Sequence, residues 1–136
     1  MYNAYLIFED SDSGFTRTLK KHWRHVSVIV PCNETQYIHI DPRLRGINYR
    51  LIEQDEVDNM YDKVLYQDIA IVRTVVNKGI NKVHMPMVIT CVEVVKRVLG
   101  VHAWWILTPR QLYNYVRCRE CKRVCQAIQL GGYNEH

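Results

Sequence analysis

Two alternating runs of apolar and polar residues constrain the fold of this chain more than any other feature. They lie in WRHVSVIVPCNETQYIHIDP, residues 23–42, and a Pro-Cys-Asn cluster separates them. Alternation over several residues predicts a strand with one face in the core, and two such runs joined by turn residues predict a β-hairpin. The sequence therefore predicts an antiparallel sheet.

Side chains alternate across a strand, so each run has two distinct faces. In the first run one face carries Val26, Val28 and Val30, and the other carries His25, Ser27 and Ile29. In the second run one face carries Ile38 and Ile40, and the other carries Tyr37, His39 and Asp41. If both apolar faces are buried, pairing across residues 31–35 can place His25 opposite or diagonal to His39, about 5 to 8 Å away. We therefore expect two imidazoles on one mostly polar face of the sheet.

Shorter patterns predict further elements around this hairpin. Strands are expected at residues 5–10, 46–52 and 70–77, and a turn at 77–82. Residues 55–67 are compatible with either a short helix or an irregular acidic segment.

The segment TCVEVVKRVLG, residues 90–100, carries clear helix boundaries. Thr90 and Glu93 have the spacing of a capping box, and Gly100 is a suitable C-terminal stop. A second capping box, with Thr108 as the cap, predicts a C-terminal helix over about 109–130. Cys91 then lies in the first turn of the first of these helices.

A thiol in the first turn of a helix is where thiol enzymes hold their nucleophile. The positive end of the helix dipole favours the thiolate and lowers the pKa of the cysteine. A base must accept the thiol proton, and an orienting group must hold that base. His25 and His39 can fill these two roles for Cys91. The alternative is a core cysteine, because Cys91 shares a helix stripe with Val94, Val95 and Val98.

These segments together resemble a known family. HVSVIV, QYIHI and TCVEVVKRVLG are similar to the two histidine-bearing strands and the nucleophile helix of the NlpC/P60 thiol hydrolases, which have a papain-like fold. Here the helix follows the strands, so the chain resembles a circularly permuted member, as in the lecithin retinol acyltransferase-like group. It is most similar to short proteins encoded by bacteriophages, and the resemblance covers roughly residues 22–113.

The resemblance implies an α+β, papain-like fold with a mainly antiparallel sheet packed on the nucleophile helix. The length of 136 residues suits one domain, over residues 1–136. It implies a cysteine peptidase or amidase in which Cys91 is the nucleophile, His25 the base and His39 the orienter. Asp41, one strand step beyond His39, is a competing orienter. Such an enzyme needs no cofactor, and its substrate would be a peptide, a peptidoglycan stem peptide or a protein.

Three cysteines near the C-terminus suggest a different function. Cys118, Cys121 and Cys125 form C-x2-C-x3-C, which invites a metal site, with His102 or His136 as the fourth ligand. On a continuous helix the same positions form an apolar stripe, which is the simpler account. The segment is also basic, with Arg110, Arg117, Arg119, Lys122 and Arg123. Two alternatives to the hydrolase follow: a metal-stabilised nucleic-acid-binding module, or a catalytically silent structural or binding protein of a phage virion.

Composition limits these possibilities. The formal net charge of +4 is small for a nucleic-acid-binding protein of 136 residues, and five cysteines are too few for a disulfide scaffold. No apolar run approaches the roughly 18 residues that cross a bilayer, and the acidic N-terminal segment is unlike a signal peptide. We therefore expect no membrane association and a place in the cytoplasm of a host cell or in a virion. The oligomeric state stays open.

Overall fold

A computed structural model describes residues 2–11, 19, 21, 23–43, 46–64, 69–76 and 90–131, with side chains described up to residue 123. Within these ranges the chain forms five strands and three helices. They are β1 (Asn3–Glu9), β2 (His25–Pro31), β3 (Gln36–Arg43), β4 (Gly46–Glu53), α1 (Gln54–Val64), β5 (Ala70–Val75), α2 (Cys91–Leu99) and α3 (Pro109–Gly131). The expected turn at residues 77–82 lies outside the described residues.

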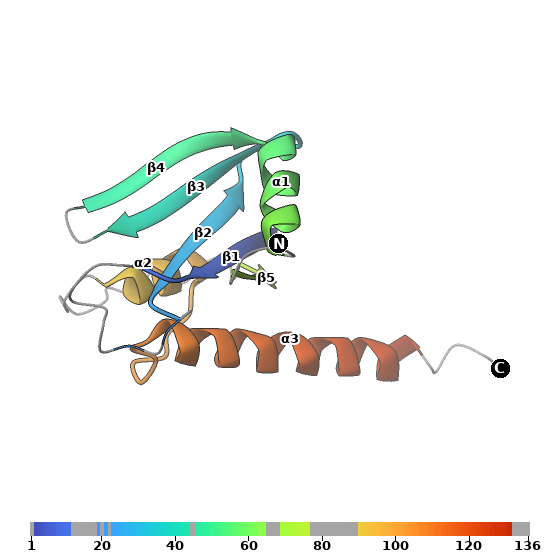
Figure 1. Ribbon diagram of the computed structural model, residues 1–136. Helices are drawn as coiled ribbons and strands as arrows, with labels where there is room; N and C mark the ends of the chain where they lie inside the picture. The colour runs from blue at the N-terminus through green and yellow to red at the C-terminus, as the bar shows by residue number, and fades with distance from the viewer. Residues whose placement is uncertain are drawn as a thin grey trace.

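The strands form one sheet in the order β4-β3-β2-β1-β5, and every neighbouring pair is antiparallel (Figure 1). This confirms the α+β class and the antiparallel sheet. The ambiguous acidic segment is a helix, α1, which begins directly after β4.

The register of β2 against β3 differs from the expected one. Pro31 pairs with Tyr37, and His39 lies opposite Ile29. The turn between these partners covers residues 32–36 and is thus shifted by one position from the expected 31–35. Within it, Asn33 Oδ1 accepts a hydrogen bond from the Gln36 amide at 2.8 Å, and the Cys32 amide donates to the Gln36 carbonyl at 2.9 Å. The prediction that His39 would lie opposite or diagonal to His25 is therefore wrong.

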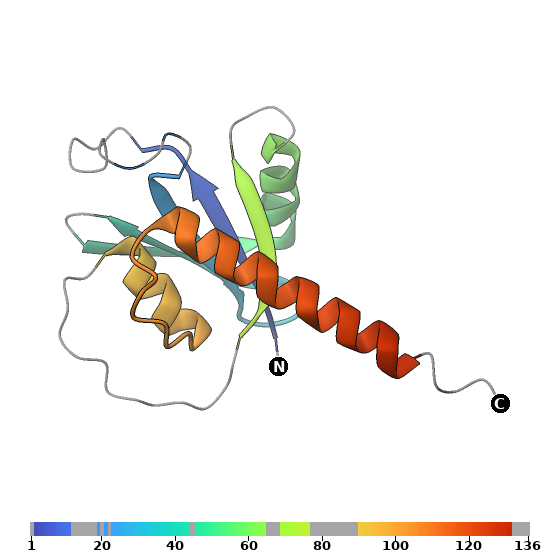
Figure 2. The same cartoon turned by 90° about the horizontal axis from the view of Figure 1, so that it is seen from below.

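Helices cover both faces of the sheet (Figure 2). On one face α2 packs against β2 and β3, and α3 packs against β5 and α2. The core on this side holds the predicted apolar face of β2 with residues of β1, α2 and α3; its most buried members include Leu6, Phe8, Val26, Val28, Val95 and Leu112. The opposite face is covered by α1, whose Val57 packs with Ile7, Ile29 and Ile52.

Both predicted helix starts are confirmed. The Glu93 amide donates to Thr90 Oγ1 at 3.2 Å, and Gly100 ends α2 with a φ of 65°. At α3 the capping box is reciprocal, since the Gln111 amide donates to Thr108 Oγ1 at 3.3 Å and the Thr108 amide donates to Gln111 Oε1 at 3.0 Å. These contacts fix where each helix begins.

One buried cation was not anticipated from the sequence. Lys96 in α2 is only 4% exposed. Its Nζ donates to the carbonyls of Ala103 and Ile106 at 3.0 and 3.1 Å, and it forms an ion pair with Glu93 Oε2 at 2.8 Å. The lysine thus ties α2 to the loop that precedes α3.

The long helix α3 extends past the sheet at its C-terminal end in both views (Figures 1 and 2). Thr74 of β5 anchors it through a hydrogen bond from Oγ1 to Glu120 Oε1 at 2.8 Å. In the described part of the chain, no helix is long and apolar enough to cross a membrane.

Candidate active site

Cys91 is the first residue of α2, directly after the N-cap Thr90. Its side chain is partly buried and packs against the core on the α2 side of the sheet. The first amides of a helix have no intrahelical acceptor, so the sulfur lies in the positive field of the helix start. The sequence predicted this position from the capping residues.

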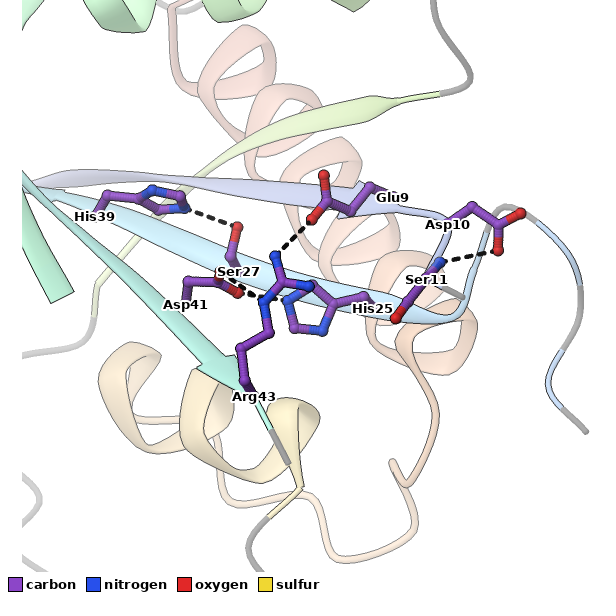
Figure 3. Close-up of polar contacts among 8 residues, drawn as sticks. All are labelled: Glu9, Asp10, Ser11, His25, Ser27, His39, Asp41 and Arg43. Atoms are coloured by element: carbon purple, nitrogen blue, oxygen red, sulfur yellow. Dashed lines mark hydrogen bonds and ion pairs between the residues drawn. The ribbon is translucent and has the colours of Figure 1, made fainter. Parts of the chain in front are cut away.

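His25 is the first residue of β2 and is 5% exposed. Two neighbouring groups act on the pKa of its imidazole, the thiol of Cys91 and the carboxylate of Asp41. The Nε2 atom lies 2.6 Å from Asp41 Oδ1 (Figure 3). Because Nε2 is engaged by Asp41, Nδ1 is the nitrogen that remains to exchange a proton with the sulfur.

The thiol reaches the start of β2 because the β2–β3 pairing ends before it. That pairing stops at Val28 and Ile40. Continued in register, the next hydrogen bonds would join Val26 to Pro42, which has no N–H. The two strands diverge at this end (Figures 1 and 3), and the backbone of Val26 helps to lower the pKa of the Cys91 thiol. Because Pro42 has no N–H, it cannot donate to the Val26 carbonyl, so the pairing would lose a hydrogen bond at this position.

The electrostatics of the pair favour charge separation. Burial alone raises the pKa of Cys91, but hydrogen bonds from His25, Val26 and Val92 and the charge of His25 bring that pKa below its ordinary value. Burial alone lowers the pKa of His25, but hydrogen bonds and attraction to Cys91 and Asp41 raise it above its ordinary value. Both changes stabilise a thiolate beside an imidazolium.

Asp41, rather than His39, contacts the base. His39 shares the same sheet face, but its Nε2 lies 3.0 Å from Ser27 Oγ (Figure 3). Burial is the main cause of the lowered pKa of His39, which favours the neutral ring. The competing orienter named from the alternation is therefore the residue that the fold brings to His25.

Two further charged residues complete this cluster, and the sequence analysis did not identify them. Arg43 Nε donates to Asp41 Oδ2 at 2.8 Å, and its Nη2 lies 3.5 Å from Glu9 Oε1 (Figure 3). Burial alone raises the pKa of Asp41, but the hydrogen bonds from His25 and Arg43 lower it, so the carboxylate stays ionised. Arg43 follows Asp41 by two residues in β3 and so lies on the same face, but its contact with Glu9 depends on β1 pairing with β2, where Glu9 lies opposite His25.

The C-terminal cysteines do not join this cluster. Cys118 and Cys121 are exposed on α3, so the expected apolar stripe is wrong at these two positions, and the side chain of Cys125 lies outside the described residues. Among the described residues, no three metal-binding side chains are grouped to hold an ion.

No family model matches this chain, and neither a curated protein nor a solved structure matches it. The chemistry of the site therefore has to be inferred from its geometry.

Proposed function

We propose that this protein is a cysteine hydrolase that cleaves an amide or peptide bond, with Cys91 as nucleophile, His25 as general base and acid, and Asp41 as the group that orients His25. The observation that carries the proposal is the placement of His25 between two groups: its Nε2 lies 2.6 Å from Asp41 Oδ1, and it is close enough to Cys91, the first residue of α2, for each to shift the pKa of the other. A nucleophile, a base and an orienting group in this order form the general arrangement of acyl-transfer enzymes.

In the first half of the reaction, the Cys91 thiolate attacks the carbonyl carbon of the substrate. A C–S bond forms, and the carbonyl π electrons move onto oxygen to give an oxyanion. When the oxyanion collapses, the C–N bond breaks and the amine nitrogen takes the proton from His25 Nδ1. The products are a free amine and a thioester on Cys91.

In the second half, His25 is neutral and removes a proton from water while the water oxygen bonds to the thioester carbon. Collapse of this intermediate breaks the C–S bond and releases a carboxylic acid, restoring the thiolate and the imidazolium. The Cys91 amide, at the first position of α2, is directed to donate to the oxyanion in both halves.

The fold gives further support to the papain-like interpretation. A helix that begins with the nucleophile packs on a strand that begins with the base, and the next strand carries the orienter. The helix follows both strands in the chain, as a permuted NlpC/P60-type relative requires. A peptide, a peptidoglycan stem peptide or a protein in a phage-infected cell or virion is the proposed substrate.

The test is the rate of Cys91 alkylation by iodoacetamide as a function of pH, followed by mass spectrometry. The pKa of Cys91 is lowered and that of His25 is raised, and both shifts favour the thiolate–imidazolium pair. Cys91 should therefore react well below pH ~8.5, where an ordinary thiol becomes reactive. In His25→Ala the onset should return to about that pH. Cys32, exposed in the β2–β3 turn, is the reference thiol in the same sample.

The matched variants are Cys91→Ala and Cys32→Ala, assayed on peptide and stem-peptide substrates. We expect Cys91→Ala to abolish turnover and Cys32→Ala to leave it unchanged. The proposal fails if wild-type Cys91 reacts no faster at acid pH than Cys32 does, or if His25→Ala leaves its profile unaltered.

A further inference from the structure

The end of the β2–β3 pairing creates a structural requirement at the site. Backbone pairing stops at Val28 and Ile40, yet the Asp41 carboxylate has to stay within hydrogen-bonding distance of His25, beyond that point. At this point β3 is paired only with β4 on its far side, and β2 only with β1. The direct contacts across the gap between β2 and β3 are therefore made by side chains.

The side chain in the right place is Arg43. Its Nε donates to Asp41 Oδ2 at 2.8 Å, while the other carboxylate oxygen, Oδ1, faces His25 Nε2 at 2.6 Å. The carboxylate is therefore held by one partner at each oxygen, which fixes its rotation. On its far side, the guanidinium reaches Glu9 Oε1 at 3.5 Å (Figure 3).

Glu9 connects this arrangement to the strand next to β2. It lies opposite His25 in the β1–β2 pairing. The contacts thus run from β1 through the guanidinium to β3, across the end of β2, and they join the strands where backbone pairing between β2 and β3 has stopped.

We propose that Arg43 is a positioning residue that, together with Glu9, clamps Asp41 beside His25 in place of the missing β2–β3 pairing. This inference rests on the proposed function, since it assigns Arg43 to the same site. Arginine suits the role because its planar guanidinium presents several donors in fixed directions and can hold two carboxylates at once, whereas lysine offers a single flexible ammonium.

The exposure of Arg43 argues against a role in folding stability alone. Its side chain is 47% exposed, and ion pairs with such exposure contribute little to stability. The charged and titratable groups that face His25 are Cys91 from α2, Asp41 and Arg43 from β3 and Glu9 from β1, with His39 farther along the same face. Among these groups, Arg43 contacts the carboxylates of both Asp41 and Glu9.

The experiment compares the pH profile of Cys91 alkylation in wild type, Arg43→Met, Arg43→Lys and Glu9→Gln. Arg43→Met should lower the rate below neutral pH by about 10-fold, the equivalent of one pKa unit in the Cys91–His25 pair. Glu9→Gln should change it in the same direction by a smaller factor. The matched control is Arg50→Met, which removes another strand arginine from a carboxylate pair with Glu56 and should leave the profile unchanged.

Arg43→Lys separates position from charge. A clamp predicts that lysine restores the rate only in part, and that the defect of Arg43→Met persists at high ionic strength, where bare charge effects are screened. Full restoration by lysine, or disappearance of the defect in high salt, overturns the clamp. Thermal unfolding of each variant establishes that it is folded. If Arg43→Met does not fold, the alkylation profile of Glu9→Gln tests the clamp instead.

The two proposals fail differently. If wild-type Cys91 has no reactivity at acid pH beyond that of Cys32, the proposed function is wrong and the clamp falls with it. If wild type has the acid-shifted profile and Arg43→Met retains it, only the clamp is wrong.

Discussion

At the scale of single residues, the two ring nitrogens of His25 have different roles: one binds the orienting carboxylate and the other exchanges protons. Nε2 lies 2.6 Å from an ionised carboxylate, so it keeps its proton, and Nδ1 is left to take and give protons. This division depends on the identity of the orienting group. A carboxylate both orients the ring and stabilises the imidazolium, whereas a neutral His39 could only orient it.

Substitution of the two candidate orienters therefore has unequal effects. Asp41→Asn removes the charge that stabilises the His25 imidazolium, and we expect Cys91 alkylation below neutral pH to fall by about 10-fold or more. His39→Gln keeps a partner for Ser27 and should change the rate by less than about 2-fold, in line with substitutions outside a site. Equal losses in the two variants would show that His39 also supports the base.

Cys91, His25 and Asp41 could all be found in the sequence, because capping residues locate a helix start and alternation assigns each strand residue to a face. The sequence predicts His39 as the orienter and Asp41 as its competitor, and the structure reverses that order. The choice between the two depends on the register, which a few hydrogen bonds in the turn after Pro31 decide. The sequence does not fix that turn geometry.

At the scale of elements, α2 is held by more than its apolar stripe. Lys96 lies inside the protein with its ammonium bonded to two carbonyls of the following loop and to Glu93. That loop presents Trp104 and Trp105 to solvent, with their rings 6.0 Å apart. From the sequence alone Lys96 and Arg97 are equivalent basic residues in a helix, and only tertiary packing separates the buried one from the exposed one.

We expect Lys96→Met to lower the free energy of unfolding by about 1 to 3 kcal/mol, because the carbonyls of Ala103 and Ile106 lose their donor inside the protein. The tryptophan fluorescence should report a loosened loop. Arg97→Met is the matched control: it removes a weaker contact to the same Glu93, at 3.5 Å, from a more exposed position, and should cost less than about 0.5 kcal/mol. Urea unfolding of both variants measures the difference. An unchanged unfolding free energy in Lys96→Met would show that the contacts of Lys96 with the loop do not stabilise the fold.

At the scale of the whole molecule, the helices on one face are joined to the sheet by a continuous core. Leu112 of α3 is fully buried in it, next to β1 and α2 residues. Replacing leucine by alanine in such a position removes apolar contacts and leaves a cavity. We expect Leu112→Ala to cost about 2 to 5 kcal/mol, measured by urea unfolding with an unchanged slope.

Leu107, 61% exposed in the loop before α3, is the control for that measurement. Leu107→Ala should alter the unfolding free energy by less than about 0.5 kcal/mol. A small loss for Leu112→Ala would mean that α3 packs on the sheet less closely than its burial indicates.

The general architecture was accessible to sequence reasoning, since strand and helix patterns agree with the elements found. The order of the strands was not. Nothing local in residues 5–10 or 70–77 indicates that they pair with each other, because such contacts join segments far apart in the chain. The contact between Glu9 and Arg43 was missed for the same reason.

That strand order also has a consequence for how the protein folds. Strands β2, β3 and β4 are close in sequence and pair in chain order. Strand β1, by contrast, pairs with β5, and Asn3 lies opposite Val75. Pairing β1 with β5 closes a loop of the whole chain between them, which is costly in entropy, and pairings between residues far apart in the sequence slow folding. During synthesis the β2–β4 meander can form early, while β1, an interior strand, has one open side until β5 has left the ribosome.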